Sequence, residues 1–349
     1  MFVKCFLLTC VLAITSSAVF NEGDMGSFDA MLAKAKADPD AFSEQLRQSE
    51  FAAIAPEIKL TGNKSARSKN ADTLPLVFLH GMGDSCFNRG MESITEESGE
   101  YMGVYSVCIP TGDTKGEDTM NGFIMSMNEN VDTFAEKVKT DTNLAKGFNC
   151  VGLSQGNNIC RGYVQKYNDP PVNTHLSIHG PVAGVAALPH CYLDGNADDL
   201  CNTVSDGLSK LAYNQRMQDF LFQADYFRDI HYVDTAEYKK YSEMAAWNNE
   251  GDVVDPSINA NFAKTNKFAM IKANADSVVV PREGEWWGQY DPADDSGSIF
   301  SMKETRWYKE DLFGLKTADE AGKVLFNSTE GNHLEFTTDE LHGWLDLYC

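Results

Sequence analysis

Short apolar runs alternate with amphipathic segments along most of the chain. Runs typical of buried strands occupy residues 74–79, 103–109, 148–151, 172–178, 268–272 and 324–326. Apolar residues recur at helical spacing in residues 123–138, after the third run, and where Leu341, Trp344, Leu345 and Tyr348 close the chain. Strands that are apolar on both faces and separated by helices form parallel sheets with helices on both sides. The pattern therefore predicts an α/β protein with a mostly parallel central sheet.

Two segments precede the first strand-like run. Lys4 is followed by an apolar stretch over residues 5–15 and then by small residues at 16–18, a pattern that predicts a cleaved signal peptide over residues 1–18. The apolar stretch is too short to span a membrane comfortably. Residues 19–72 are rich in Ala, Asp, Glu, Lys and Ser, and we interpret them as an N-terminal extension or propeptide-like segment. We expect one domain over residues 73–349, in a protein of the secretory pathway without a transmembrane anchor.

The third apolar run leads into Gly-Leu-Ser-Gln-Gly at residues 152–156, with a helix-like stretch after it. This is the Gly-x-Ser-x-Gly pattern of a nucleophile elbow, a sharp turn that holds a serine clear of the backbone. A serine hydroxyl is a useful nucleophile only where a base can take its proton, and the two glycines leave room for that base. The pattern also arises by chance in loops, but the strand and helix around it favour Ser154 as a nucleophile.

The first apolar run ends in a glycine-rich loop, His-Gly-Met-Gly-Asp at residues 80–84. In α/β hydrolases, two backbone N–H groups hold the oxyanion that forms on the substrate: one follows the nucleophile, and the other belongs to the loop after an early strand. Here these would be the N–H groups of Gln155 and Met82. A phosphate-binding loop fits less well, because no Gly-Lys-Ser/Thr or full Gly-x-Gly-x-x-Gly follows. We interpret His80 as a structural histidine beside the site, because a base has to reach Ser154 from above the elbow.

A carboxylate and a histidine complete the set. Asp276 follows the fifth apolar run, where the carboxylate that orients a catalytic histidine is expected, and His333 lies on the loop beyond the last run. Asp252 has a similar local pattern but follows a polar stretch, so we favour Asp276. The chain order Ser154, Asp276, His333 is that of α/β hydrolases. Five other histidines have no comparable placement and are interpreted as core or surface residues: His175, His179, His190, His231 and His342.

The alternation of strands and helices changes between about residues 188 and 266. Few strand-like runs occur there, and apolar residues recur near helical spacing at Leu211, Met217, Phe220, Leu221 and Tyr226. We expect a helical insertion over the active face. Its apolar side either lines a pocket for an acyl chain or forms the ordinary core of an inserted subdomain.

Net charge and the spacing of side chains limit the kinds of ligand and partner that this protein is expected to bind. The formal net charge is -22, which argues against the phosphate backbone of a nucleic acid as the main partner. No spacing of histidines and cysteines suggests zinc, and chemistry based on a serine needs no cofactor. We therefore expect no nucleic acid, no metal and no cofactor.

The cysteines are read in the oxidising context of a secreted protein. Nine cysteines occur, and two of them, Cys5 and Cys10, lie in the predicted signal peptide, so seven remain and at least one thiol is unpaired or intermolecular. Cys191 and Cys201 bracket a short polar loop and are the best disulfide candidates. Cys150 and Cys160 are expected to be buried thiols.

Two positions match the acceptor pattern for N-glycosylation. Asn63 and Asn327 each begin an Asn-x-Ser/Thr sequence, which a luminal route makes usable where the asparagine is exposed.

Several segments are more specific than the elbow alone. They are residues 75–86, 152–156, 188–191, 223–226, 275–279, 285–288, 311–316 and 330–334. Together they resemble the palmitoyl-protein thioesterase family of lysosomal α/β hydrolases, over most of the chain. The resemblance implies an α/β-hydrolase fold and the removal of long-chain fatty acyl groups from S-acylated cysteines of proteins or peptides, in a lysosome or similar acidic vacuole or outside the cell.

The resemblance also implies a role for each site residue. Ser154 is the nucleophile of an acyl-enzyme mechanism, His333 is its base and Asp276 orients the histidine, while Met82 and Gln155 supply the oxyanion N–H groups. It further implies a disulfide between the cysteines at 191 and 201.

The chain departs from the family pattern at four places. The segment 19–72 is extra, Asn157 replaces a small residue after the elbow, and Cys86 lacks an adjacent cysteine. Residues 181–183 are Pro-Val-Ala where a polar loop is expected. These differences bear on processing, disulfides and substrate preference rather than on the three catalytic residues.

Two other functions fit the same residues. A lipase-like carboxylesterase would use the same serine, histidine and aspartate on oxygen esters. A non-enzymatic acyl-binding protein would keep the fold without the chemistry, but the complete set of Ser154, Asp276 and His333 counts against it.

Overall fold

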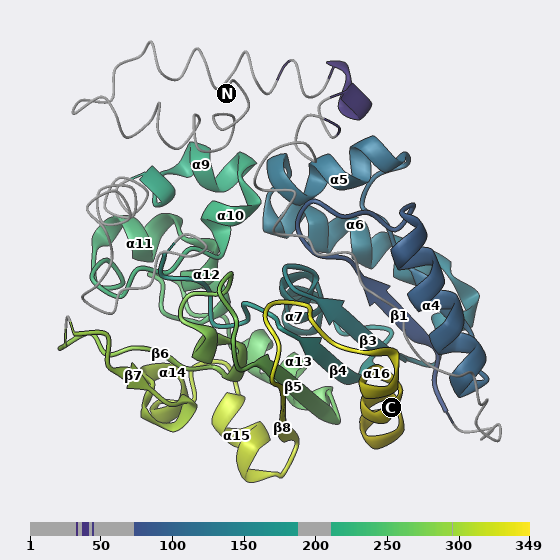
Figure 1. Ribbon diagram of the computed structural model, residues 1–349. Helices are drawn as coiled ribbons and strands as arrows, with labels where there is room; N and C mark the ends of the chain where they lie inside the picture. Colours follow the sequence, from purple (N-terminus) through teal and green to yellow (C-terminus); the bar gives the residue numbers. More distant parts are fainter. Residues whose placement is uncertain (1–32, 34–36, 42–43, 45–72, 188–210, 295) are drawn as a thin grey trace.

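A parallel six-stranded sheet lies at the centre of the structure, a computed structural model that describes residues 33, 37–41, 44, 73–187, 211–294 and 296–349 (Figure 1). Its order is β2-β1-β3-β4-β5-β8, and every neighbouring pair is parallel. The strands are β1 (Leu76–Leu79), β2 (Ser106–Cys108), β3 (Phe148–Leu153), β4 (Val172–Ile178), β5 (Lys267–Ala273) and β8 (Val324–Thr329). The α/β class and the parallel central sheet predicted from the apolar runs are confirmed.

Helices cover both faces of the sheet because the strands are apolar on both sides. Successive side chains of a strand point to opposite faces. Leu76 and Phe78 of β1 therefore pack in a core with α4 (Arg89–Met102) and α16 (Thr338–Tyr348). Val77 and Leu79 pack in a second core on the other face, which contains α6 (Met127–Thr140), α7 (Gly156–Lys166) and α13 (Pro256–Lys264). The predicted amphipathic helix at the end of the chain is confirmed as α16, which buries Leu341, Trp344, Leu345 and Tyr348.

The second strand is shorter than the apolar run that predicted it. Gly103 and its neighbours were expected in the strand, but Gly103 ends α4 in the left-handed conformation, with φ 69°, and its N–H bonds to Gly99 O. This is the usual way for a glycine to end a helix. The strand begins only at Ser106.

The prediction of a single helix over residues 123–138 is wrong. The structure has two helices, α5 (Lys115–Ile124) and α6. Ser126 starts the second one, because its hydroxyl accepts the Glu129 N–H and the Glu129 carboxylate accepts the Ser126 N–H. Such a capping box satisfies backbone groups that a continuous helix would have bonded internally.

The insertion was expected over about residues 188–266, and the structure describes it from residue 211 on. Short helices fill this described part. They are α9 (Gln215–Phe220), α10 (Phe222–Asp225), α11 (Ala236–Tyr241) and α12 (Glu243–Trp247), followed by α13. Met217 and Leu221 belong to a small core of these helices, whereas Tyr226 packs in the main core. Met217 and Leu221 thus form the ordinary core of an inserted subdomain, which was one of the two interpretations of the insertion. The expected insertion boundaries of 188 and 266 stay a prediction.

The remaining elements connect these layers. They are η2 (Thr142–Leu144), η3 (Arg282–Trp286), β6 (Gln289–Tyr290), β7 (Ile299–Phe300), η4 (Met302–Glu304), α14 (Arg306–Lys309) and α15 (Leu315–Glu320). Across the described ranges, no helix has both the length and the apolar character needed to cross a membrane.

Two disulfides occur among the described residues, and they correct the expected cysteine pairing. Cys150 in β3 is bonded to Cys160 in α7, so these residues are not buried thiols, and Cys86 is bonded to Cys108. The strand and the helix after the elbow run back along each other, which brings residues ten apart to a Cα separation of 6.2 Å. Cys349 is a free cysteine. The expected pair Cys191 and Cys201 lies outside the described residues.

The Cys150–Cys160 bond leads to a prediction for stability. Closing a loop of ten residues removes conformational entropy from the unfolded chain, so replacing both cysteines with alanine should lower the free energy of unfolding by about 3 kcal/mol. Urea denaturation without reductant measures this change. Cys349→Ala is the matched control and should change stability far less. Equal urea midpoints for the double variant and the wild type would contradict the prediction.

Candidate active site

Ser154 lies on a strained turn directly after β3. Its φ is 51°, a left-handed conformation that is rare for a residue with a side chain. The turn needs glycine on both sides: a Cβ on Gly156 would lie 2.5 Å from Leu79 O, and one on Gly152 would collide with the Asn157 side chain. The glycines therefore let β1, β3 and α7 approach closely enough to hold the serine side chain out of the turn.

Two hydrogen bonds join Ser154, His333 and Asp276. His333 Nε2 is 2.7 Å from Ser154 Oγ, and His333 Nδ1 is 2.6 Å from Asp276 Oδ2. His333 and Asp276 are buried, while Ser154 is partly exposed. The three residues come from loops after β8, β5 and β3, so they meet at the edge where the strands have their carboxyl ends.

The surroundings of Asp276 keep it ionised. Burial alone would raise the pKa of Asp276, but the hydrogen bond and charge of His333 outweigh burial and lower the pKa to about 2. Its other oxygen accepts the N–H groups of Val278 and Val279, at 2.7 and 2.8 Å. An ionised Asp276 holds the Nδ1 proton of His333, so Nε2 is left to take a proton from Ser154.

The loop that carries His333 is held by two further side chains. Asn332 Oδ1 accepts the N–H of Ser277 at 2.9 Å and that of His333 at 2.7 Å. His179 Nδ1 accepts the N–H of Leu334 at 2.8 Å, and its Nε2 lies 3.0 Å from the Thr329 hydroxyl.

His179 is therefore part of the site, although the sequence analysis assigned it to the core or surface. Burial, together with the charge of His333, lowers the pKa of His179 to about 3, so its ring is neutral. The available sequence signal was its position, immediately after the β4 run.

Asn157 accounts for one departure from the family pattern. Its Nδ2 donates to the carbonyls of Ser154 and Ile178, at 3.0 and 3.2 Å. Its Oδ1 lies 3.2 Å from Nε2 of His175, a buried ring whose pKa is lowered to about 3 by burial and then by the charge of Arg161. The amide thus ties the elbow to the end of β4, a connection that a smaller residue could not make.

The glycine-rich loop after β1 passes directly beside the serine. A Cβ built on Gly81 would lie 3.1 Å from Ser154 Cβ. Gly81 O accepts a hydrogen bond from His80 Nδ1 at 2.9 Å. The Met82 N–H belongs to the same planar, trans peptide group, so it points away from that carbonyl. His80 consequently fixes the direction of the Met82 N–H, one of the two expected oxyanion donors.

The side chain of the second expected donor residue reaches the insertion. Gln155 Nε2 donates to Gly122 O at 2.8 Å, and Gln155 Oε1 accepts from Gln223 Nε2 at 2.8 Å and from the Tyr226 hydroxyl at 3.2 Å. Gln223 lies in α10. The backbone next to Ser154 is therefore braced by α5 and by the helices of the insertion.

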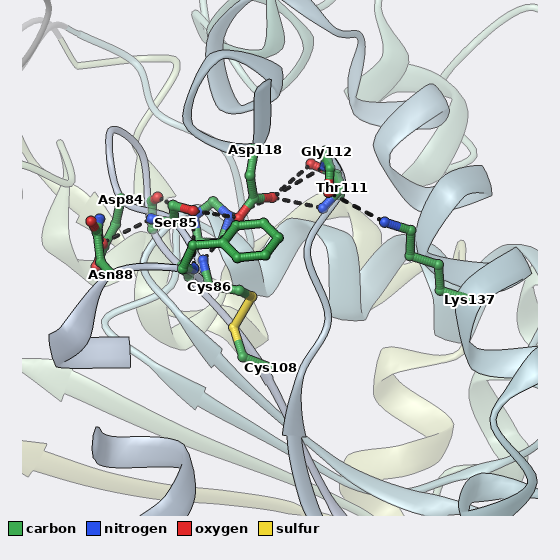
Figure 2. The surroundings of a disulfide bond; sticks show 12 residues. Asp84, Ser85, Cys86, Asn88, Cys108, Thr111, Gly112, Asp118 and Lys137 are labelled. Atoms are coloured by element: carbon green, nitrogen blue, oxygen red, sulfur yellow. Dashed lines mark hydrogen bonds and ion pairs between the residues drawn. A yellow bond between two sulfur atoms is a disulfide. The ribbon is translucent and has the colours of Figure 1, made fainter. Parts of the chain in front are cut away.

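Asp118, which no sequence pattern distinguished, connects the oxyanion loop to its neighbours. Its carboxylate is 3.2 Å from His80 Nε2 and accepts the Ser85 hydroxyl and the Cys86 N–H, both at 2.8 Å. It also accepts the Thr111 N–H at 2.7 Å. Figure 2 shows the contacts of Asp118 with Ser85 and Cys86 on one segment and with Thr111 on the other, next to the Cys86–Cys108 disulfide that joins the two segments.

His80 and Asp118 form a buried ion pair. Burial lowers the pKa of His80, but the charge and hydrogen bond of Asp118 outweigh burial and raise the pKa to about 9. Burial raises the pKa of Asp118, but His80 and the other donors hold it well below its usual range. A protonated ring can donate to Gly81 O and to Asp118 together, which agrees with the interpretation of His80 as a structural histidine.

Other sequence-predicted positions lie away from this site or outside the described residues. Asp252 is exposed, so it is not the partner of His333. Asn327 lies within β8 and its Nδ2 is 3.3 Å from the Tyr348 hydroxyl, while Asn63 is outside the described residues.

Two groups of side chains among the described residues have metal-ligand spacing. One contains His80, Cys86 and Asp118, and the other contains His179, Asp276 and His333. Cys86 is in a disulfide and offers no thiolate, and both nitrogens of His179 are engaged. These donors are used for structure, so neither group fits a metal ion.

Comparisons with known proteins cover most of the chain. The family model described as palmitoyl protein thioesterase matches residues 75–333. Palmitoyl-protein thioesterase 1 of Caenorhabditis elegans is 34% identical over 274 residues, 78% of this chain and 90% of the relative. Palmitoyl-protein thioesterase 3 of Dictyostelium discoideum is 30% identical over 274 residues, 77% and 88% of the two chains. Lysosomal thioesterase PPT2 of Homo sapiens is 25% identical over 259 residues, 72% and 78% of the two chains.

The His80–Asp118 pair predicts a pH dependence of stability. The pKa of His80 is about 9 in the folded protein against an ordinary 6.5, so its contribution is complete below pH 6.5 and is lost as the pH rises through 9. This loss should amount to about 3 kcal/mol in the free energy of unfolding. Urea titrations of the wild type and Asp118→Asn across this range measure it.

Asp118→Asn serves as the comparison because it removes the charge that holds the His80 proton. Its stability should fall much less between pH 6.5 and 9 than that of the wild type. Parallel curves for the two proteins would show that the ion pair does not stabilise the fold.

Proposed function

The chain belongs to the palmitoyl protein thioesterase family, and from this premise we propose that it removes long-chain fatty acyl groups from S-acylated cysteines of proteins or peptides. The observation that carries the proposal is the continuous pair of hydrogen bonds, 2.7 Å and 2.6 Å, from Ser154 through His333 to Asp276. We assign Ser154 as the nucleophile, His333 as its base and Asp276 as the carboxylate that orients the base.

Acylation begins when Ser154 Oγ attacks the thioester carbonyl and His333 takes the proton of this hydroxyl. The negative charge that forms on the carbonyl oxygen is stabilised by the backbone N–H groups of Gln155 and Met82. The carbon–sulfur bond then breaks, the acyl group remains on Ser154, and His333 gives its proton to the departing cysteine sulfur, which leaves the ring neutral again. Two observations support this assignment: His80 fixes the peptide group that carries the Met82 N–H, and Gly81 lies close to Ser154.

Deacylation repeats the same steps with water. His333 takes a proton from water as the oxygen attacks the acyl-enzyme, and the fatty acid leaves with Ser154 regaining its proton. No step needs a cofactor. A cysteine thiol has an ordinary pKa of about 8.5, so it leaves with little help from an acid, which favours thioesters over amides as substrates.

We place the protein in the secretory pathway, with the lysosome or a similar acidic compartment as its destination. The predicted signal peptide at residues 1–18 and the relative described as a lysosomal thioesterase support this location. The two described disulfides also fit an oxidising compartment. Disulfide formation between Cys191 and Cys201 and glycosylation of Asn63 and Asn327 belong to the same proposal.

The decisive experiment compares a palmitoyl-cysteine peptide with its oxygen-ester counterpart, palmitoyl-serine, as substrates of the purified protein. We expect the thioester to be hydrolysed with much the higher kcat/KM, and Ser154→Ala to abolish turnover. A preference for the oxygen ester would assign the protein as a lipase-like carboxylesterase. Folded protein without turnover of either substrate would favour an acyl-binding role.

Asp276→Asn tests the orienting carboxylate. In this variant the amide oxygen stays with the N–H groups of Val278 and Val279, so the NH₂ group faces His333 Nδ1 and donates to it. The ring proton is then on Nε2, which can no longer accept the proton of Ser154, and kcat should fall by about 10⁴-fold with little change in fold. Asp252→Asn is the matched control, because Asp252 has a similar local sequence but is exposed, and it should retain full activity. Loss of activity in the control, or its retention in Asp276→Asn, would reverse the assignment.

A further inference from the structure

A second carboxyl group lies against Asp276, and the mechanism above does not use it. Glu285 is on η3, the short helix that packs on β5, and none of its surface is exposed. Its Oε2 accepts the Ala273 N–H at 2.9 Å. Ala273 also receives the Asp276 N–H on its carbonyl, at 3.2 Å, so Glu285 holds the turn from which Asp276 projects.

The Glu285 and Asp276 carboxyl groups are in hydrogen-bond contact with each other. Glu285 Oε1 is buried and, among the described residues, no N–H or O–H group donates to it. Two carboxylates have no proton to share, so this contact is a hydrogen bond only if one group is protonated.

The donors around the two groups decide which one carries the proton. Asp276 has His333 on one oxygen and the N–H groups of Val278 and Val279 on the other, all of which stabilise a negative charge. Within the described part of the chain, the Ala273 N–H is the one N–H donor to Glu285, whose position is completely buried. Burial first, and then the charge of Asp276, raise the pKa of Glu285 well above its usual range. The proton therefore resides on Glu285.

We propose that Glu285 is a neutral carboxylic acid that donates a hydrogen bond to Asp276 and acts as a positioning residue for the Ser154–His333–Asp276 set. This inference rests on the proposed function of that set. The bond holds the Asp276 carboxylate in place and takes up part of its negative charge. Asp276 then stabilises the protonated form of His333 less strongly, so His333 stays available as a base to lower pH. This property suits a thioesterase of an acidic compartment.

Few other charged groups face this pair. Lys272 of β5 acts on Glu285 from a distance, and its Nζ lies 4.0 Å from Glu283 Oε1 and 4.3 Å from the centre of the Trp286 ring. His179, at the end of β4, faces both Asp276 and His333 but is neutral. Among the described residues, the protonation of Glu285 and Asp276 is thus set mainly by the proton that they share and by His333.

Glu285→Gln and Glu285→Met separate this role from a purely structural one. Glutamine keeps both bonds, because its amide NH₂ can donate to Asp276 while its oxygen accepts the Ala273 N–H. Methionine keeps the volume but donates nothing. Glu283→Gln is the control, because Glu283 is on the same short helix and half-buried, and its charge lies towards Lys272.

The primary measurement is the rate at which a fluorophosphonate labels Ser154 between pH 4 and 9. This rate depends on His333 as base but not on a preference for thioesters. The acid limb is the part of the profile where the labelling rate falls towards low pH. Glu285→Gln and Glu283→Gln should have the acid limb of the wild type. Glu285→Met should shift it upward by about one pH unit, so that labelling at acidic pH is about tenfold slower. The same shift should appear in kcat/KM for the palmitoyl thioester.

Two results would overturn the inference. If the acid limb of Glu285→Gln moves downward, Glu285 is ionised in the wild type, because the substitution has then removed a negative charge. If Glu285→Met keeps the wild-type limb, Glu285 only fills space. Should the methionine variant fail to fold, the glutamine variant decides the question, together with the infrared difference spectrum of the wild type minus Glu285→Gln at neutral pH. This difference should contain the band of a protonated carboxylic acid.

The outcome for substrate is separate. Labelling of Ser154 with the expected pH shifts, but without thioester turnover, would overturn the proposed substrate and leave the role of Glu285 intact. Normal thioester turnover with unshifted limbs would overturn only the role of Glu285.

Discussion

The active site depends on the close approach of three backbone segments around Ser154. The serine has a left-handed conformation, and the start of α7 presses against the end of β1 so tightly that no side chain fits at Gly156. Gly81 meets the serine from the neighbouring loop. The proposed roles of Ser154 as nucleophile and of two neighbouring backbone N–H groups as oxyanion donors need this spacing, and many of the described side-chain contacts of the site hold it.

Three buried histidines show how surroundings decide the role of a side chain. His80 faces a carboxylate through one nitrogen and a carbonyl through the other, and both contacts favour the charged ring. His179 accepts a backbone N–H, which requires a neutral ring. Only His333 lies between a carboxylate and a hydroxyl, so it alone can exchange a proton with the serine during a reaction.

The same loops are braced from the insertion side. Gln223 and Tyr226 hold the Gln155 side chain, and Arg161 of α7 donates to Val182 O and Asn248 Oδ1 while its guanidinium packs against Trp287. Movement of these helices would therefore be transmitted to the backbone beside the nucleophile. The insertion and the active-site backbone are thus mechanically linked.

Local patterns in the sequence are enough to predict part of this structure. Apolar runs located the six strands. The glycines around Ser154, together with the strand-end positions of Asp276 and His333, pointed to the three side chains that the structure joins by hydrogen bonds. The sequence alone could not locate Asp118, Glu285 or His179, nor the split of one expected helix into α5 and α6. The tertiary structure decided these, because a buried acid is recognisable only from the partners that folding brings to it. His80 is 38 positions from Asp118 in the chain, and Cys150 forms a disulfide because β3 and α7 bring Cys160 against it.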